Sequence, residues 1–234
     1  MKLKHSPIRF DILTLFPEAF GDYFRQSILG KAQERNAIAI HIWNIRDYTT
    51  DKHRTADDVP YGGGAGMVMK AEPVLAALQD VLKKTARIPR ADKKIILLSP
   101  APKEFSQERA IRYANHRQII LICGRYEGID ERVTKFIDEK LSIGRYVLSG
   151  GELAAMVVVD AVSRMIPAVL GNATSLAEES YAPAQSGPTL EYPQYTRPAV
   201  LNVSGKKLRV PAILLSGDHK KIAEWRQKHM KTLK

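Results

Sequence analysis

The sequence of 234 residues contains one cysteine, Cys123, which excludes an intrachain disulfide and any zinc site built from several cysteines. Its six histidines show no ligand spacing such as H-x-x-x-H, so we expect no metal site. No apolar run approaches the roughly 18 residues that a membrane helix needs, and no signal-peptide core follows the basic first residues. These absences favour a soluble, cytoplasmic protein in a reducing compartment, with no membrane partner.

Several common active-site signatures are absent too. Residues 61–66 are rich in glycine, but no strand directly precedes them and their spacing differs from G-x-G-x-x-G. The Walker A lysine and the G-x-S-x-G nucleophile elbow are also missing. Cys123 lies at the end of an apolar run, which favours a packed and inert thiol over a nucleophile.

Positive charge is the first feature that points to a partner. The 36 Lys and Arg residues exceed the 25 Asp and Glu residues, which gives a net charge of +11. Residues 200–234 hold nine basic and two acidic residues, so they carry +7 of that charge, and residues 83–103 hold seven basic residues against Asp92. Such patches suit a polyanion such as nucleic acid, although charge runs are also common on solvated helix faces.

Apolar patterning divides most of the chain into alternating strands and helices. Strands are expected at residues 8–16, 37–43, 94–98 and 118–123, with a further extended segment at residues 141–148. Helices are expected at residues 72–84, 103–115 and 151–169, with a short one from Pro17. This alternation predicts an α/β domain with a mostly parallel sheet.

The composition changes at Gly171. Residues 171–198 contain four prolines together with several Ser and Thr residues, which is typical of a linker and, at this length, of a functional lid. We therefore expect a domain of residues 1–170, a flexible linker of residues 171–198 and a small basic helical domain of residues 199–234.

Three loops of small residues follow predicted strands. They begin at Ser99, at Gly124 and at Ser142. Ligands of open α/β sheets bind at the carboxyl ends of the strands, and glycine lets backbone groups approach a ligand closely. Each loop alone is most simply a tight turn, but the three together indicate a ligand site.

Few residues stand out as candidates for acid–base chemistry. Asp160 and Arg164 lie four residues apart in the predicted helix 151–169, where a salt bridge is the simplest interpretation. Glu178 and Glu179 lie in the predicted linker, where two adjacent acids are usually solvated.

Three longer strings stand out in the sequence: residues 51–67 (DKHRTADDVPYGGGAGM), 123–132 (CGRYEGIDER) and 146–153 (YVLSGGEL). They resemble the signature segments of bacterial tRNA (guanine-N1)-methyltransferases. Residues 164–171 and 192–198 match the same family, and the likeness runs from Phe10 to about Lys228. The strings are long and keep the family's order, so the resemblance covers nearly the whole chain.

The resemblance implies a SPOUT methyltransferase domain with a deep trefoil knot, followed by a linker and a C-terminal helical domain that binds tRNA. It also implies an obligate homodimer. The implied reaction transfers a methyl group from S-adenosylmethionine to N1 of the guanosine at position 37 of tRNA, next to the anticodon.

The resemblance also assigns site residues. The family's catalytic arginine corresponds to Arg164, and its catalytic aspartate, aligned without gaps after Gly171, corresponds to Glu179. The implied cofactor contacts are Gly66, Leu97, Leu98, Ser99, Pro100, Gly124, Glu127, Ile143, Gly144, Arg145, Tyr146, Val147 and Leu148. If Glu179 is not the base, Glu178 and Asp160 are the competing candidates.

This sequence departs from the family pattern at four places. The usual Gln-Gly after Ser-Pro is Ala101-Pro102, and the usual Asp after Ile-Gly is Arg145. The base position carries Glu179 in place of Asp, and the linker after Tyr181 is longer. We expect the first two changes to be tolerated, because cofactor contacts in such knots are made largely by the backbone.

Two other functions remain open. One is methylation of a different RNA by an enzyme of the same superfamily, which the pair Arg164 and Glu179 disfavours. The other is an RNA-binding module that has lost its chemistry, and the changes at Arg145 and Glu179 keep this alternative open.

Overall fold

The computed structural model of the chain describes residues 7–167, 169–170, 180–181 and 189–232. The chain forms two compact units, Met1–Gly171 and Asn172–Lys234. In the described residues, no helix combines the length and the apolarity needed to cross a bilayer.

The first unit is built on a parallel sheet, as the sequence predicts. Its described strands are ordered β2-β1-β6-β5-β7, and every neighbouring pair is parallel. Their bounds are β1 Ile8–Thr14, β2 Ile38–Asn44, β5 Lys93–Leu98, β6 Gln118–Cys123 and β7 Glu139–Leu141. The central strand β6 is buried along its whole length, which explains its continuous apolar run.

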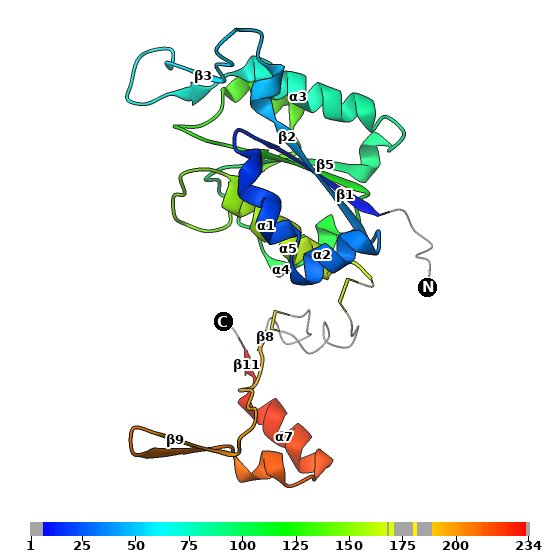
Figure 1. The fold of residues 1–234 in the computed structure, drawn as a ribbon, viewed down its shortest axis with the longest axis vertical. Coiled ribbons are helices and arrows are strands. Elements are labelled where there is room, and N and C mark those ends of the chain that lie inside the picture. The colour runs from blue at the N-terminus through cyan, green and yellow to red at the C-terminus, as the bar shows by residue number, and fades with distance from the viewer. Residues whose placement is uncertain (1–6, 168, 171–179, 182–188, 233–234) are drawn as a thin grey trace. The chain divides into compact units, whose positions relative to one another are not determined.

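Helices cover both faces of this sheet (Figure 1). One face carries α1 Gly21–Phe24, α2 Ser27–Glu34, α4 Gln107–Tyr113 and α5 Glu152–Arg164. The other face carries α3 Ala71–Lys84. Short 3-10 helices connect these elements at η1 Pro17–Phe20, η2 Ile45–Tyr48, η3 Arg90–Asp92 and η4 Glu131–Phe136, and a two-residue pairing joins β3 Asp57–Asp58 to β4 Val68–Met69.

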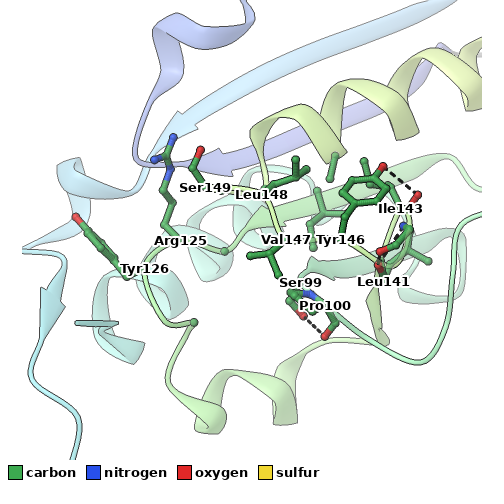
Figure 2. Close-up of a pocket in the computed structure, with 18 of the residues that line it drawn as sticks. Ser99, Pro100, Arg125, Tyr126, Leu141, Ile143, Tyr146, Val147, Leu148 and Ser149 are labelled. Carbon is green, nitrogen blue, oxygen red and sulfur yellow. Dashed lines mark hydrogen bonds between the residues drawn. The ribbon is translucent and has the colours of Figure 1, made fainter. Parts of the chain in front are cut away.

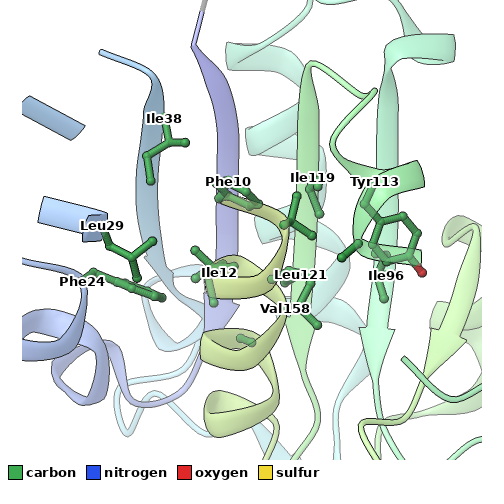
Figure 3. Packing of buried hydrophobic residues seen from close by; sticks show 14 of the residues in the cluster. Phe10, Ile12, Phe24, Leu29, Ile38, Ile96, Tyr113, Ile119, Leu121 and Val158 are labelled. Carbon is green, nitrogen blue, oxygen red and sulfur yellow. The ribbon is translucent and has the colours of Figure 1, made fainter. Parts of the chain in front are cut away.

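Alternation along the strands separates the hydrophobic core into two clusters. Ile119 and Leu121 of β6 pack toward α5, where Val158 meets them (Figure 3). Ile120 and Ile122 of the same strand belong to the cluster beneath α3. Burial on both sides fixes the register of the sheet, because a shift by one residue would exchange the two sets.

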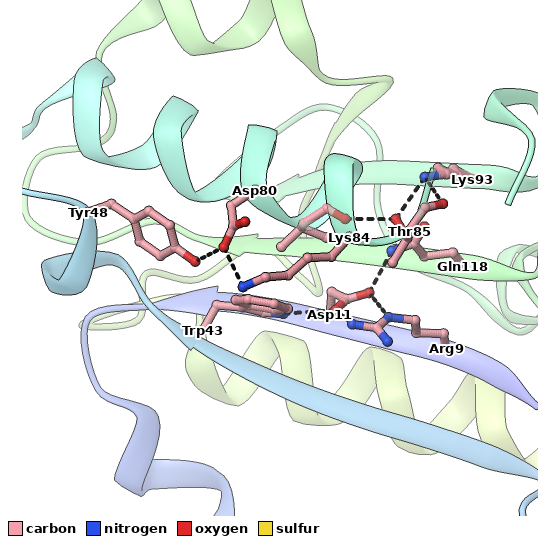
Figure 4. Close-up of polar contacts among 10 residues, drawn as sticks. Arg9, Asp11, Trp43, Tyr48, Asp80, Lys84, Thr85, Lys93 and Gln118 are labelled. Atoms are coloured by element: carbon pink, nitrogen blue, oxygen red, sulfur yellow. Dashed lines mark hydrogen bonds and ion pairs between the residues drawn. The ribbon is translucent and has the colours of Figure 1, made fainter. Parts of the chain in front are cut away.

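A buried carboxylate ties three strands together on the α3 side of the sheet (Figure 4). Asp11 is fully buried and accepts hydrogen bonds from Arg9 (2.7 and 2.8 Å), from Trp43 Nε1 (2.8 Å) and from Gln118 Nε2 (2.6 Å). Nearby, Lys93 donates to the hydroxyl of Thr85 over 2.8 Å, and burial lowers the pKa of this lysine. These partners offset the cost of removing charged groups from water.

Three expected elements differ from the structure. The helix expected at residues 103–115 is α4, which begins after the N-cap Ser106 and ends at Tyr113. The segment at residues 141–148 is not a strand, because β7 already ends at Leu141 and bends follow. The apolar helix expected at residues 151–169 is α5, which ends at Arg164. In the last two places the apolar residues beyond the element are side chains of loops, so hydrophobicity alone gave the wrong bounds.

The second unit contains more than a helix. The expected basic helix is α7 His219–His229, which begins at the N-cap Asp218 and is preceded by η5 Ala212–Leu215. A hairpin of β9 Val200–Val203 and β10 Lys206–Arg209 accompanies it, and β8 Thr189–Leu190 pairs with β11 Lys231–Thr232. The sequence did not indicate these strands, all of which are short. β9 and β10 are solvent-exposed, and β8 is half-buried.

Candidate active site

A cavity of about 280 Å³ opens at the carboxyl ends of β5, β6 and β7 (Figure 2). Three segments surround it: Leu98–Pro100 after β5, residues 124–128 after β6, and residues 141–151 between β7 and α5. The full lining is Leu98, Ser99, Pro100, Gly124, Arg125, Tyr126, Glu127, Gly128, Leu141, Ser142, Ile143, Gly144, Tyr146, Val147, Leu148, Ser149, Gly150, Gly151 and Ala154. The three loops of small residues that the sequence singled out therefore form one site.

Backbone hydrogen bonds join the three loops to one another. The Ser99 N–H donates to the carbonyl of Leu141 over 3.1 Å, and the Gly124 N–H donates to the carbonyl of Leu98 over 3.3 Å. The Gly151 N–H donates to the carbonyl of Gly124 over 2.8 Å. Main-chain hydrogen bonds consequently join the walls of the cavity to one another.

Glycine is required where these loops touch. A Cβ at Gly151 would lie 2.8 Å from the Cα of Cys123, which is too close for any side chain. Gly144 has a φ of 157°, and a Cβ there would lie 2.3 Å from the ring of Tyr146. Gly151 therefore lets the loop before α5 lie directly against the end of β6, and Gly144 leaves space for the Tyr146 ring within the same loop.

Ten of the thirteen expected cofactor contacts line this cavity. The three that do not are Gly66, Leu97 and Arg145. Leu97 points into the core beneath α3, because alternate residues of β5 face opposite sides of the sheet. Gly66 lies against Glu127 of the lining, since a Cβ on this glycine would come within 2.6 Å of that side chain.

Arg145 points away from the cavity. Its side chain is 93% exposed and its Nε lies 2.7 Å from Oε1 of Glu104. Ala101 and Pro102, the other departure from the family pattern near the site, are also absent from the lining. None of these three residues therefore contributes to the walls of the cavity.

Several lining residues, among them Arg125 and Ser149, were not predicted from the sequence. Both belong to strings that carried the resemblance, and Arg125 also follows directly after a buried strand. Serine, glycine and apolar residues dominate the lining, so the cavity offers backbone donors and acceptors and an apolar surface, as small-molecule sites do.

Cys123, the lone thiol, is not suited to act as a nucleophile. Burial, followed by the charge of Glu152, raises the pKa of Cys123 well above its ordinary value. A thiol held in its protonated form is a poor nucleophile. In the described ranges, no cluster of three His, Cys, Asp or Glu side chains is arranged to hold a metal ion.

Of the residues proposed for proton transfer and charge stabilisation, Arg164 and Asp160 are described, and neither lines the cavity. Arg164 is the last residue of α5 and is partly buried. Glu178 and Glu179 lie outside the described residues. Asp160, the competing candidate, accepts a hydrogen bond from the hydroxyl of Tyr23, and this bond raises the pKa of the tyrosine.

Comparison with known proteins gives matches along nearly the whole chain. The family model for tRNA (Guanine-1)-methyltransferase TrmD matches residues 8–233. A tRNA (guanine-N(1)-)-methyltransferase of Anaeromyxobacter dehalogenans is 52% identical over 221 residues, covering 94% of this chain and 85% of that protein. A Bacillus cereus protein of the same name is 46% identical over 222 residues, covering 94% of this chain and 86% of its own length.

A solved structure matches as well. The crystal structure of tRNA (m1G37) methyltransferase from Aquifex aeolicus aligns with a TM-score of 0.76 at 34% sequence identity. The alignment covers 95% of this chain and 89% of that chain.

The tight contact at Gly151 predicts a stability effect. Gly151→Ala should lower the free energy of unfolding by about 1–3 kcal/mol, because the added methyl group forces α5 away from the end of β6. Urea denaturation measures the change. Gly21→Ala is the control, because its Cβ would meet only the flexible end of Arg25, and it should change stability by less than about 1 kcal/mol. Equal effects of the two substitutions would contradict the tight contact.

Proposed function

The chain belongs to the tRNA (guanine-N1)-methyltransferase family, and we propose that it transfers a methyl group from S-adenosylmethionine to N1 of the guanosine at position 37 of tRNA. One observation carries the proposal: relatives with that name are about 50% identical over 94% of the chain. The cavity at the strand ends, built from the family's own signature strings, agrees with it.

The lining of the cavity suits S-adenosylmethionine. Ile143, Val147 and Leu148 offer apolar surface for the adenine ring, and the loops at Ser99 and Gly124 offer backbone donors and acceptors. Glycines that leave no space for a Cβ bring the backbone to the surface of the cavity. This donor supplies a methyl group already activated on a sulfonium centre.

The protein's own part in the chemistry is to move a proton and to stabilise charge. Guanine N1 carries a proton at neutral pH, so a carboxylate must remove it while the methyl group arrives. Glu179 is the proposed base. Negative charge then develops toward O6 of guanine, where the guanidinium of Arg164 stabilises it. The target base leaves its stack to reach the site.

The second unit supplies a basic surface for tRNA. Lys207 and Arg209 follow one face of the hairpin formed by β9 and β10, because they are alternate residues of one strand. In α7, the guanidinium of Arg226 lies 5.0 Å from the ring centroid of Tyr192, and Trp225 stacks on His229 at 4.1 Å. Cations and aromatic rings together, among them the 48% exposed Tyr195, are suited to phosphates and bases of RNA.

A homodimer belongs to the same proposal. Leu153 and Val157 lie one turn apart on α5, and they are 58% and 44% exposed. Val147 in the wall of the cavity is 85% exposed. Large apolar side chains gathered beside a site indicate a surface that a second copy covers. We propose that the base of one subunit completes the cavity of the other.

The remaining parts of the proposal concern organisation. Residues 1–170 are the methyltransferase domain with its deep trefoil knot, and residues 199–234 lie in the part that binds tRNA. The expected linker of residues 171–198 is shorter than the sequence predicts, because β8 pairs with β11 and Tyr192 contacts Arg226 within the second unit. The enzyme acts in the cytoplasm. Arg145 does not face the cavity, so the alternative of a module without chemistry depends on the change at Glu179 alone.

The first test maps the product. Incubation with labelled S-adenosylmethionine and unmodified tRNA should give 1-methylguanosine at position 37, identified by nuclease digestion and mass spectrometry. A tRNA with adenosine at position 37 is the control and should remain unlabelled. Label in another nucleoside would support the related methyltransferases, and no label at all would support the module without chemistry.

The second test concerns the base. Glu179→Gln should reduce the single-turnover rate by about 10²–10⁴-fold, because the amide keeps the shape of the side chain but does not accept the proton. Glu179→Asp should keep substantial activity, and the binding of S-adenosylmethionine should change little. If Glu179→Gln reacts at the wild-type rate while Asp160→Asn or Glu178→Gln reacts slowly, Glu179 is not the base. The base is then the residue whose substitution lowers the rate.

The third test concerns the dimer. Ser99→Trp fills the cavity from its rim, so it and Glu179→Gln should each be inactive alone. Co-expression of the two variants with different tags gives mixed dimers in which one cavity and one base are intact. These mixed dimers should recover activity if base and cavity come from different subunits. Inactive mixed dimers, or full activity of a wild-type monomer by light scattering, would contradict the arrangement.

A further inference from the structure

One buried carboxylate beside the cavity has no part in the mechanism above. Glu152 is the first residue of α5, directly after Gly150 and Gly151, and its side chain is only 6% exposed. Its Oε1 accepts a hydrogen bond from the hydroxyl of Thr14 over 2.7 Å. Its Oε2 lies 3.3 Å from Nε of Arg125 and accepts a hydrogen bond from it. A buried charge of this kind is costly unless such partners remain in place.

The partners of Glu152 are themselves held in place. The guanidinium carbon of Arg125 lies 4.2 Å from the ring centroid of Phe16, in cation–π geometry. The Phe16 N–H donates to the same Thr14 hydroxyl over 2.9 Å. Thr14, Phe16, Arg125 and Glu152 thus form one connected group, the Glu152 cluster, which joins the end of β1, the loop after β6 and the start of α5.

This cluster holds two of the three loops that line the cavity. Arg125 pairs with Gly150 as an isolated antiparallel bridge, and the Gly151 N–H donates to the carbonyl of Gly124. A Cβ at Gly150 would lie 2.4 Å from both Arg125 Nε and Glu152 Oε2, so the backbone packs directly on the ion pair. Figure 2 shows the Arg125 side chain beside Ser149 at one end of the lining.

The chemistry of a carboxylate explains why an amide would not serve equally well. One oxygen accepts from a hydroxyl and the other from a guanidinium, and bonds to a charged donor are roughly twice as strong as neutral ones. The position at the first turn of α5 further favours a negative charge, because the helix N-terminus carries partial positive charge. In a glutamine, the NH₂ group would face one of these donors and the charge would be lost.

We propose that Glu152 is a positioning residue for the methyl-donor site: through Arg125 it holds the loop after β6 against the turn before α5, so that the backbone groups of both loops face the cofactor. The inference rests on the proposed use of S-adenosylmethionine. Glu152 itself is not among the residues that line the cavity, and it acts through Arg125, Gly150 and Gly151.

The role predicts a specific kinetic signature. Loss of the carboxylate loosens two walls of the cavity before the cofactor binds, so affinity for S-adenosylmethionine falls. Once the cofactor is bound, the base and Arg164 are unaffected. Glu152→Gln should therefore raise the Kd and the KM for S-adenosylmethionine at least about tenfold, with kcat at saturating cofactor within about twofold of wild type.

A matched control separates positioning from general stability. Asp11 is equally buried, pairs with Arg9 and lies in the network on the α3 side of the sheet. Asp11→Asn should lower the unfolding temperature as Glu152→Gln does, while leaving the Kd for S-adenosylmethionine unchanged. Thr14→Ser keeps the hydroxyl and should bind as wild type does, whereas Thr14→Val removes it and should weaken binding in the same direction as Glu152→Gln.

Isothermal titration of the full chain with S-adenosylmethionine, well below the unfolding temperature of each variant, tests the inference. A raised Kd in Glu152→Gln and Thr14→Val, but not in Asp11→Asn and Thr14→Ser, is the expected result. If wild type binds S-adenosylmethionine and all four variants bind it equally well, Glu152 has only a structural role. The inference is then contradicted, and the proposed function is not. If wild type itself does not bind S-adenosylmethionine, both the proposed function and the inference are contradicted.

Discussion

The functional site depends on the parallel register of β5, β6 and β7, whose carboxyl ends meet at one edge of the sheet. That register is set by burial on both faces, since Ile120 and Leu121 belong to opposite core clusters. Because the strands end side by side, the loops after them can exchange backbone hydrogen bonds, and glycine lets them approach closely. A cavity with main-chain walls follows from this packing, and it places apolar surface and peptide groups around one small molecule.

Buried and exposed charges have different roles in this protein. Buried charges such as Asp11 and Glu152 have fixed partners inside the first unit, where they hold strands and loops in place. The excess positive charge lies instead on exposed elements, above all in the second unit, where it is available to a polyanion. Arg145, which the sequence pattern made a possible obstacle to cofactor binding, is one of these exposed charges.

The sequence predicts much of this arrangement for physical reasons. The continuous apolar runs of β5 and β6 identify strands buried on both faces, and the loops of small residues after them identify the edge that forms the cavity. The family resemblance is confirmed by the comparisons. Leu97 stays a predicted cofactor contact, although alternation along β5 places its side chain in the core, opposite Leu98. The strand expected at residues 141–148 failed because apolar side chains such as Val147 lie in a loop. The ion pair of Arg125 and Glu152 joins residues 27 apart in sequence, and no local pattern reveals such a contact.

The central claim is that the cavity at the strand ends is the place where the methyl donor binds. Amide chemical shifts of the ¹⁵N-labelled chain, recorded with and without S-adenosylmethionine, test it directly. The account predicts that the largest changes fall on residues 98–100, 124–128 and 142–151, with small changes in the second unit. Changes concentrated instead around Tyr192 and Arg226, which line a separate cavity of about 550 Å³ in the second unit, would contradict it.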